Sequence, residues 1–119
     1  MLRMVPSDDS IWLAQLRRGA LEHCVLALLR HRERYGFELA RTLADAGGLL
    51  AGEGTIYPLL ARLRRNGLVN TTWRESAEGP PRRYYRLTAV GELALSTFVQ
   101  HWQLFRDGVD RILEEASAA

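Results

Sequence analysis

Arginine is the residue type in this 119-residue chain whose distribution points to a chemistry, because seven arginines fall within residues 62–86. Two glutamates accompany them, so this segment carries a net charge of +5, whereas the whole chain carries +2. Residues 1–61 hold seven arginines and seven acidic residues, and residues 87–119 hold two arginines and five carboxylates. Arginine suits two-point contacts with phosphate and guanine. A basic segment between a neutral and an acidic one therefore indicates a surface that meets a polyanion.

The residue types used in catalysis and metal binding form no comparable pattern. His23, His31 and His101 are scattered, and none falls in a zinc-protease or nucleophile motif. The single cysteine, Cys24, cannot close a disulfide within the chain, and no spacing of cysteine and histidine matches a zinc site. We therefore expect a protein that is not an enzyme and uses no metal or cofactor, with Cys24 as a buried structural thiol.

The composition is that of one globular domain, with 47% apolar and 25% charged residues. The longest apolar run, residues 24–29, is far shorter than the ~20 residues that a membrane span needs. Asp8 and Asp9 stand where a secretory signal would need an apolar core. These observations predict a cytoplasmic protein with no membrane partner.

The elements that must position the arginines begin with a helix over residues 10–30, preceded by a flexible N-terminal arm at residues 1–9. Apolar residues recur in this helix at spacings of three and four, which is typical of one buried face. They are Leu13, Leu16, Ala20, Cys24 and Leu28. Gly19 either bends the helix or marks a second start.

A charged loop is expected at residues 31–34, and a short second helix follows it. This helix begins after Gly36 and ends at the glycine pair Gly47 and Gly48, which is a stop signal. Its apolar residues are Phe37, Leu39, Ala40 and Leu43.

The third helix is placed by Pro58, because proline is tolerated only in the first turn of a helix. With Thr55 as the N-cap, Pro58 takes the third helical position, and the Thr55 hydroxyl is expected to accept a hydrogen bond from a first-turn N–H. The expected buried face consists of Ile56, Leu59, Leu60 and Leu63. The helix is expected to end at Asn66 and Gly67.

Two short strands are indicated at residues 68–74 and 83–87, which are rich in aromatic and β-branched side chains. The link at residues 75–82 contains one glycine and two prolines, so we expect a turn too long for a tight hairpin. Tyr84 and Tyr85 alternate along the second strand. One of them should pack inward and the other should face outward, and the sequence does not decide which one.

The expected elements are three helices, a two-stranded hairpin and a long last helix that starts at the N-cap Thr88 and runs to about Glu115. The fold is therefore mainly α with a small β-hairpin, and this order matches a winged helix-turn-helix domain at residues 10–88 followed by a helix at residues 89–119. An unrelated α+β domain with the same order is the alternative that element order leaves open.

The last helix carries apolar residues at spacings of 4, 3, 4 and 3, the repeat found where two helices pack. They are Phe98, Trp102, Phe105, Val109 and Ile112. About 27 helical residues extend ~40 Å, more than the preceding domain can cover. We expect a homodimer through this stripe, which would space two DNA-reading helices to match successive turns of a duplex. The alternative is a stripe that folds back on its own domain.

Four segments of the sequence resemble the PadR family of transcriptional regulators. They are YGFELA (35–40), GTIYPLL (54–60), GLV (67–69) and GPPRRYYRLT (79–88). The resemblance extends over roughly residues 13–115. It implies a cytoplasmic, dimeric repressor with an N-terminal winged domain, and a single C-terminal helix is similar to the short subclass of the family.

For DNA binding, we expect the start of the third helix to face bases or phosphates and the arginines of the helix and the wing to reach the backbone. The expected contacts are Thr55, Tyr57, Pro58, Arg62, Arg65, Arg82, Arg83 and Tyr84. For Arg64, DNA contact and a solvated surface are equally expected. A winged domain that binds only other proteins is the rival, and the basic segment favours DNA.

A small ligand is a further expectation that follows from the resemblance. Drug-sensing relatives present an aromatic residue of the last helix into a central pore that the first helix also lines. By this resemblance, Trp102, with Trp12 and Gln15, would contact an aromatic or hydrophobic effector that relieves repression. The alternatives are that Trp102 is simply part of the dimer interface and that the repressor needs no ligand.

Overall fold

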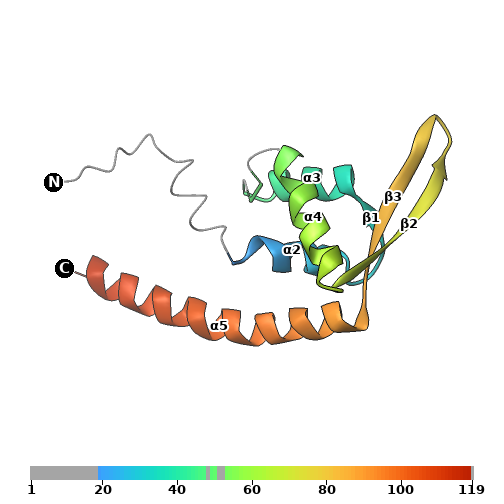
Figure 1. Cartoon of the computed structure of the whole chain (residues 1–119). Helices are drawn as coiled ribbons and strands as arrows, with labels where there is room; N and C mark the ends of the chain where they lie inside the picture. The colour runs from blue at the N-terminus through green and yellow to red at the C-terminus, as the bar shows by residue number, and fades with distance from the viewer. Residues whose placement is uncertain (1–18, 48, 51–52, 119) are drawn as a thin grey trace.

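The computed structural model describes residues 19–47, 49–50 and 53–118 (Figure 1). In this part of the chain, four α-helices and a three-stranded antiparallel sheet form a winged helix-turn-helix fold with a long C-terminal helix, as predicted. The elements are α2 (Leu21–Leu28), β1 (Arg34–Tyr35), α3 (Gly36–Asp45), the 3-10 turn η1 (Glu53–Thr55), α4 (Ile56–Arg65), β2 (Val69–Ser76), β3 (Gly79–Leu87) and α5 (Ala89–Ser117).

The helix α2 begins after Gly19, which has a φ of 85° that glycine adopts readily. Of the two readings of Gly19, the structure therefore supports a helix start. The expected end at Arg30 was wrong by two residues. The buried residues of α2 are Val25 and Leu26. The predicted arm and the expected contacts at Trp12 and Gln15 lie outside the described residues.

Cys24 is half-buried against the core rather than fully buried. Burial raises the pKa of its thiol, because removal from water disfavours the thiolate. The thiol is therefore protonated at neutral pH and packs as a small apolar side chain.

The strand β1 was not predicted, because residues 31–34 were expected to be a loop. Arg34 pairs with Tyr85 and Tyr35 pairs with Tyr84 in antiparallel register, so β1 adds a third strand on the free side of β3. A two-residue segment is too short to show the alternating pattern of a strand in the sequence. Arg34 and Tyr35 form a strand only because they pair with β3. The adjoining α3 then starts at Gly36, where the Glu38 carboxylate accepts a hydrogen bond from the Tyr35 backbone N–H at 3.3 Å.

The helix α4 lies where Pro58 predicted it, with Pro58 at the third helical position. Thr55 takes the predicted N-cap position, but the predicted capping hydrogen bond of its hydroxyl was wrong. Thr55 has helical dihedral angles (φ −87°, ψ −13°) and makes no side-chain capping hydrogen bond, because η1 leads directly into α4. The predicted face is buried and consists of Ile56, Leu59, Leu60 and Leu63.

The wing is a longer hairpin than predicted, and the long turn expected at residues 75–82 was wrong. Ser76 pairs with Gly79, so only two residues form the turn, and the next pair is Arg74 with Arg82. One residue of β2 between these pairs, Glu75, therefore lies opposite two prolines of β3. Such a bulge tolerates proline, which has no N–H to donate.

The hydrophobic core lies between α2, α3, α4 and the base of the sheet. Its larger members include Leu26, Leu39, Leu60 and Leu63. Tyr85 is buried in this core, whereas Tyr84 is half-buried on the other side of the strand, so the predicted alternation is confirmed.

The long helix α5 starts at the predicted N-cap. The Thr88 hydroxyl accepts a hydrogen bond from the Gly91 N–H at 3.0 Å and donates to the Gly67 carbonyl at 2.7 Å. The first half of α5 packs against α2, and the second half extends beyond the domain (Figure 1). Its Gly108 does not interrupt it. None of the described helices combines the length and hydropathy required to span a membrane.

Candidate nucleic-acid interface

The basic segment folds into one concave surface between α4 and the wing. A hollow of about 390 Å³ lies there, and it is lined by Tyr57, Leu60, Ala61, Arg64, Arg65, Arg83 and Tyr85. A second hollow of about 480 Å³ shares three of these residues and is lined by Tyr35, Gly36, Tyr57, Trp73, Arg82, Arg83 and Tyr85. We call the two hollows together the wing groove. Aromatic rings and guanidinium groups dominate its lining.

Tyr57 is held at the junction of the two hollows by its contact with α3. Its side chain is 52% exposed, and its ring lies so close to Gly36 that a Cβ atom there would be 2.7 Å from Cε1. The absence of a side chain at Gly36 therefore lets the ring lie against the start of α3. One part of the ring packs on protein and the rest faces the groove.

The wing arginines stand over aromatic rings. The guanidinium carbon of Arg82 lies 4.5 Å from the ring centroid of Tyr35, and that of Arg83 lies 4.9 Å from the ring centroid of Trp73. These are cation–π distances. Among the ion pairs of the described residues, none involves Arg64, Arg65, Arg82 or Arg83. These four side chains therefore carry uncompensated positive charge around the groove.

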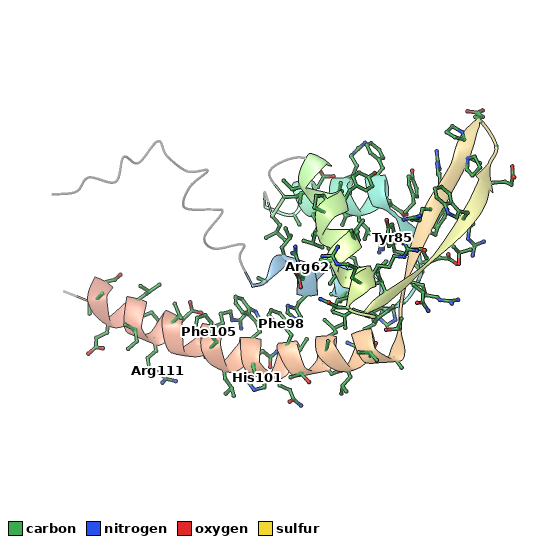
Figure 2. The ribbon with its side chains drawn as sticks, in the orientation of Figure 1. Arg62, Tyr85, Phe98, His101, Phe105 and Arg111 are labelled. Atoms are coloured by element: carbon green, nitrogen blue, oxygen red, sulfur yellow. The ribbon has the colours of Figure 1, made fainter. Side chains whose placement is uncertain are left out.

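Arg62, an expected DNA contact, has a partner within the protein. Its Nε donates a hydrogen bond to the Glu22 carboxylate at 2.5 Å, and Figure 2 shows Arg62 between α4 and α2. The pair joins the two helices on the α2 side of α4. Sequence reasoning missed it because 40 residues separate the partners.

Arg74 is also neutralised, by Glu33 in the loop before β1. A hydrogen bond to the Glu33 carboxylate and the attraction between the two charges raise the pKa of Arg74. Its guanidinium carbon also lies 5.4 Å from the ring centroid of Tyr84. The pair ties the wing to the loop between α2 and β1, so Arg74 adds little to the positive charge of the surface.

The structure brings some expected contacts together and separates others. Tyr57, Arg65 and Arg83 meet in the wing groove, and Thr55 and Pro58 are exposed at the start of α4. Tyr35 and Trp73 also line the groove and were not predicted. The signals that could have found them are the first position of the YGFELA segment for Tyr35 and the aromatic strand position directly opposite Arg83 for Trp73.

A second surface is the apolar face of α5, where aromatic rings form a ladder. His23 of α2 stacks on Phe98 with ring centroids 4.2 Å apart, and Phe98, Trp102 and Phe105 follow at centroid distances of 6.0 and 6.3 Å. Figure 2 shows Phe98 and Phe105 on the side of α5 toward the domain, and His101 and Arg111 on the opposite side.

Farther along α5, this face is open to solvent in the single chain. Phe105 is 65% exposed and Ile112 is 63% exposed. An apolar groove of about 510 Å³ runs here and is lined by Leu104, Phe105, Gly108, Val109, Ile112 and Leu113. Solvent-exposed apolar surface of this kind on a helix marks a contact with another surface.

Comparison with known proteins gives one consistent result. The family model described as "Transcriptional regulator PadR-like family" matches residues 25–97. The chain is similar to the solved structure of a PadR family transcriptional regulator from Eggerthella lenta, with 38% identity and a TM-score of 0.77. That match covers 91% of this chain and 96% of the other.

Two further solved structures are similar to this chain. A PadR-like transcriptional regulator from Bacillus cereus is 37% identical over 83% of this chain and 96% of its own, with a TM-score of 0.76. A Streptococcus transcriptional regulator is 43% identical over 82% of this chain and 96% of its own, with a TM-score of 0.74.

Proposed function

Because this chain belongs to the PadR-like family of transcriptional regulators, we propose that it is a cytoplasmic repressor that binds operator DNA as a homodimer and releases it when a small ligand binds. The observation that carries the DNA-binding part is the wing groove, whose lining includes four arginines that form no ion pair with any described residue, namely Arg64, Arg65, Arg82 and Arg83. Clustered positive charges attract a polyanion, because each phosphate they neutralise releases counterions from the DNA.

Within this proposal, α4 enters the major groove and the wing lies along the backbone. Thr55, Tyr57 and Pro58 are exposed at the first turn of α4, where side chains reach base edges or phosphates. Arg65 at the other end of α4 and Arg83 on the wing neutralise phosphates of the backbone. Arg62 would bind a phosphate only if its ion pair with Glu22 broke first.

On the wing, Arg82 and the half-buried Tyr84 lie on the same side of β3 and complete the backbone contact. The guanidinium of Arg82 and the hydroxyl of Tyr84 both donate hydrogen bonds, which suits phosphate oxygens.

The test of DNA binding is selection of duplexes from a random pool, followed by anisotropy titrations of the enriched duplex against salt. We expect an enriched site with two symmetric halves and an affinity whose logarithm falls linearly with log[salt]. A salt-independent affinity, or no enriched duplex, would instead support a winged domain that binds only proteins.

Dimerisation is proposed through the apolar face of α5. Phe98, Trp102, Phe105, Val109 and Ile112 form one stripe along this helix, and most of it is exposed in the single chain. A second copy packed against it by two-fold symmetry would bury the stripe and present two α4 helices to one duplex.

The ligand response is proposed for Trp102, which is 39% exposed within the aromatic ladder. A planar aromatic guest could stack there, together with Trp12 and Gln15, and favour a dimer whose α4 helices are misplaced for DNA. We expect planar dyes to quench tryptophan fluorescence in the native protein and in Trp73→Phe, but not in Trp102→Ala. Quenching that persists in Trp102→Ala would contradict this site, and dye binding without effect on DNA affinity would support a ligand-independent repressor.

A further inference from the structure

Trp73 is an exposed tryptophan of the wing whose ring lies against an arginine. It lies directly opposite Arg83 in the β2–β3 register, so both side chains are on the same side of the hairpin. The guanidinium carbon of Arg83 lies 4.9 Å from the indole centroid, and Trp73 is 61% exposed. The ring therefore contributes little to the core, and its position beside Arg83 needs another explanation.

Arg83 is the arginine that both hollows of the wing groove share. Its Nε is buried and has no hydrogen-bond partner among the described residues. A buried donor without an acceptor has an energetic cost, and the protein itself supplies no acceptor here. Because Arg83 also lines a basic groove that is open to solvent, an anion entering this groove would compensate the charge of its guanidinium.

We propose that Trp73 is a positioning residue that holds the guanidinium of Arg83 ready to bind a DNA backbone phosphate in the wing groove. The indole covers the face of the planar guanidinium, and the N–H groups at its edge stay available for phosphate oxygens. Holding a long side chain in its bound orientation reduces the entropy that binding would otherwise cost. This inference rests on the proposed DNA-binding function.

The other arginine–aromatic pairs of the wing show why Trp73 is the informative one. Arg82 lies over the ring of Tyr35, and Arg74 lies over the ring of Tyr84. Both tyrosines are half-buried and pair with each other across the sheet. Arg74 is also neutralised by Glu33. Trp73 is more exposed than either tyrosine, so removal of its ring should disturb the packed base of the sheet least.

The experiment is a double-mutant cycle with Trp73→Ala, Arg83→Ala and the double variant, measured by anisotropy on the selected duplex. We expect Trp73→Ala to weaken binding by about 2- to 5-fold, as an exposed cation–π contact predicts. Arg83→Ala should weaken binding and reduce the salt slope by ~0.9, for one lost phosphate contact. The double variant should bind no more weakly than Arg83→Ala, because the ring acts only through the arginine.

Two variants separate positioning from a structural role. Trp73→Phe keeps a ring under the guanidinium and should recover most of the affinity. Thr72→Ala changes the neighbouring position of β2, opposite Tyr84 on the other side of the hairpin, and should weaken binding less than Trp73→Ala does. Thermal melting checks that all variants fold.

The outcomes distinguish this inference from the function on which it rests. The positioning role would be overturned if Trp73→Ala reduced DNA affinity by the same factor with and without Arg83. The ring would then contact DNA or support the wing independently of Arg83. Unchanged affinity in Trp73→Ala would overturn it too. If the native protein itself enriches no duplex, the proposed DNA binding fails first, whatever the Trp73 variants do.

Discussion

Single arginines of the basic segment differ in what each guanidinium touches, and this difference decides how much charge each offers to a partner. Arg64 and Arg65 are exposed and form no ion pair within the part of the chain that the structure describes, and Arg83 lies against the ring of Trp73. Arg62 and Arg74 form ion pairs with glutamates of other elements. A charge already neutralised within the protein releases fewer counterions when it meets DNA. The positive charge available to a partner is therefore smaller than the seven arginines of the segment would give.

Arg82 and Arg74 provide a matched pair of substitutions, because they are opposite each other in the hairpin. We predict that Arg82→Ala weakens DNA binding and reduces the slope of log K against log[salt] by ~0.9, the value for one phosphate contact. Arg74→Ala should change this slope much less, because Glu33 already compensates its charge. Anisotropy titrations at several salt concentrations measure both slopes, and equal slopes for the two variants would contradict the prediction.

At the scale of secondary structure, three side-chain links connect α4, the wing and α5 to neighbouring elements. Glu22 and Arg62 join α2 to α4, and Glu33 and Arg74 join the wing to the loop before β1. The Thr88 hydroxyl joins the start of α5 to the turn after α4 through the Gly67 carbonyl. Each link connects residues far apart in the sequence and adds to the core contacts that hold the wing, α4 and α5 together.

The Glu22–Arg62 pair leads to a comparison between two arginines of α4. We predict that Arg62→Ala changes the salt slope of DNA binding less than Arg65→Ala does, because Arg62 must first leave Glu22. Both partners are partly exposed, so the loss of the pair should cost less than about 1 kcal/mol of unfolding free energy. Salt titrations and urea unfolding measure the two effects. If Arg62→Ala instead lowers the slope as much as Arg65→Ala, Arg62 contacts DNA as the sequence predicted.

The N-cap of α5 leads to a stability prediction. We expect Thr88→Ala to lower the free energy of unfolding by about 1–2 kcal/mol, because it removes the acceptor for the Gly91 N–H and the donor to Gly67. Thr88→Ser keeps the hydroxyl and should cost much less. Urea unfolding of both variants measures this difference, and similar losses would show that the methyl group rather than the hydroxyl matters.

At the scale of the whole molecule, the chain is elongated, with a principal extent of 59 Å along its longest axis. The compact part and the wing lie toward one end, and α5 extends past the domain toward the other (Figure 1). Monomeric proteins rarely leave a continuous apolar face of a helix exposed to solvent. This exposed face supports the proposed dimer, in which α5 would set the distance between the two wing grooves.

The dimer can be tested with two charge substitutions on opposite sides of α5. We predict that Phe105→Glu produces monomers at micromolar concentration, because it places a charge in the proposed apolar interface. Arg111→Glu lies on the other side of the helix (Figure 2) and should leave the dimer intact. Sedimentation velocity distinguishes these states, and a dimer that survives Phe105→Glu would require another interface. The monomer should also bind the full operator far more weakly than the dimer.

Periodicity and local stop signals were sufficient to predict most of the elements. The buried face of α4, the third helical position of Pro58, the N-cap Thr88 and the inward–outward alternation of Tyr84 and Tyr85 all follow from rules that act within a few residues. The family and the winged fold were predictable for the same reason, because their motifs are local.

Only the tertiary structure decided β1, the tight hairpin with its prolines at a bulge, and the partners of the arginines. A two-residue strand exists only through its pairing with β3, and the ion pairs of Arg62 and Arg74 join residues about 40 positions apart. The same holds for the stacking of Arg82 on Tyr35. The sequence alone determined which residues carry charge and which side of each element is apolar. Contacts across the fold determined which charges stay available for a partner, because such contacts depend on chain segments that local rules do not relate.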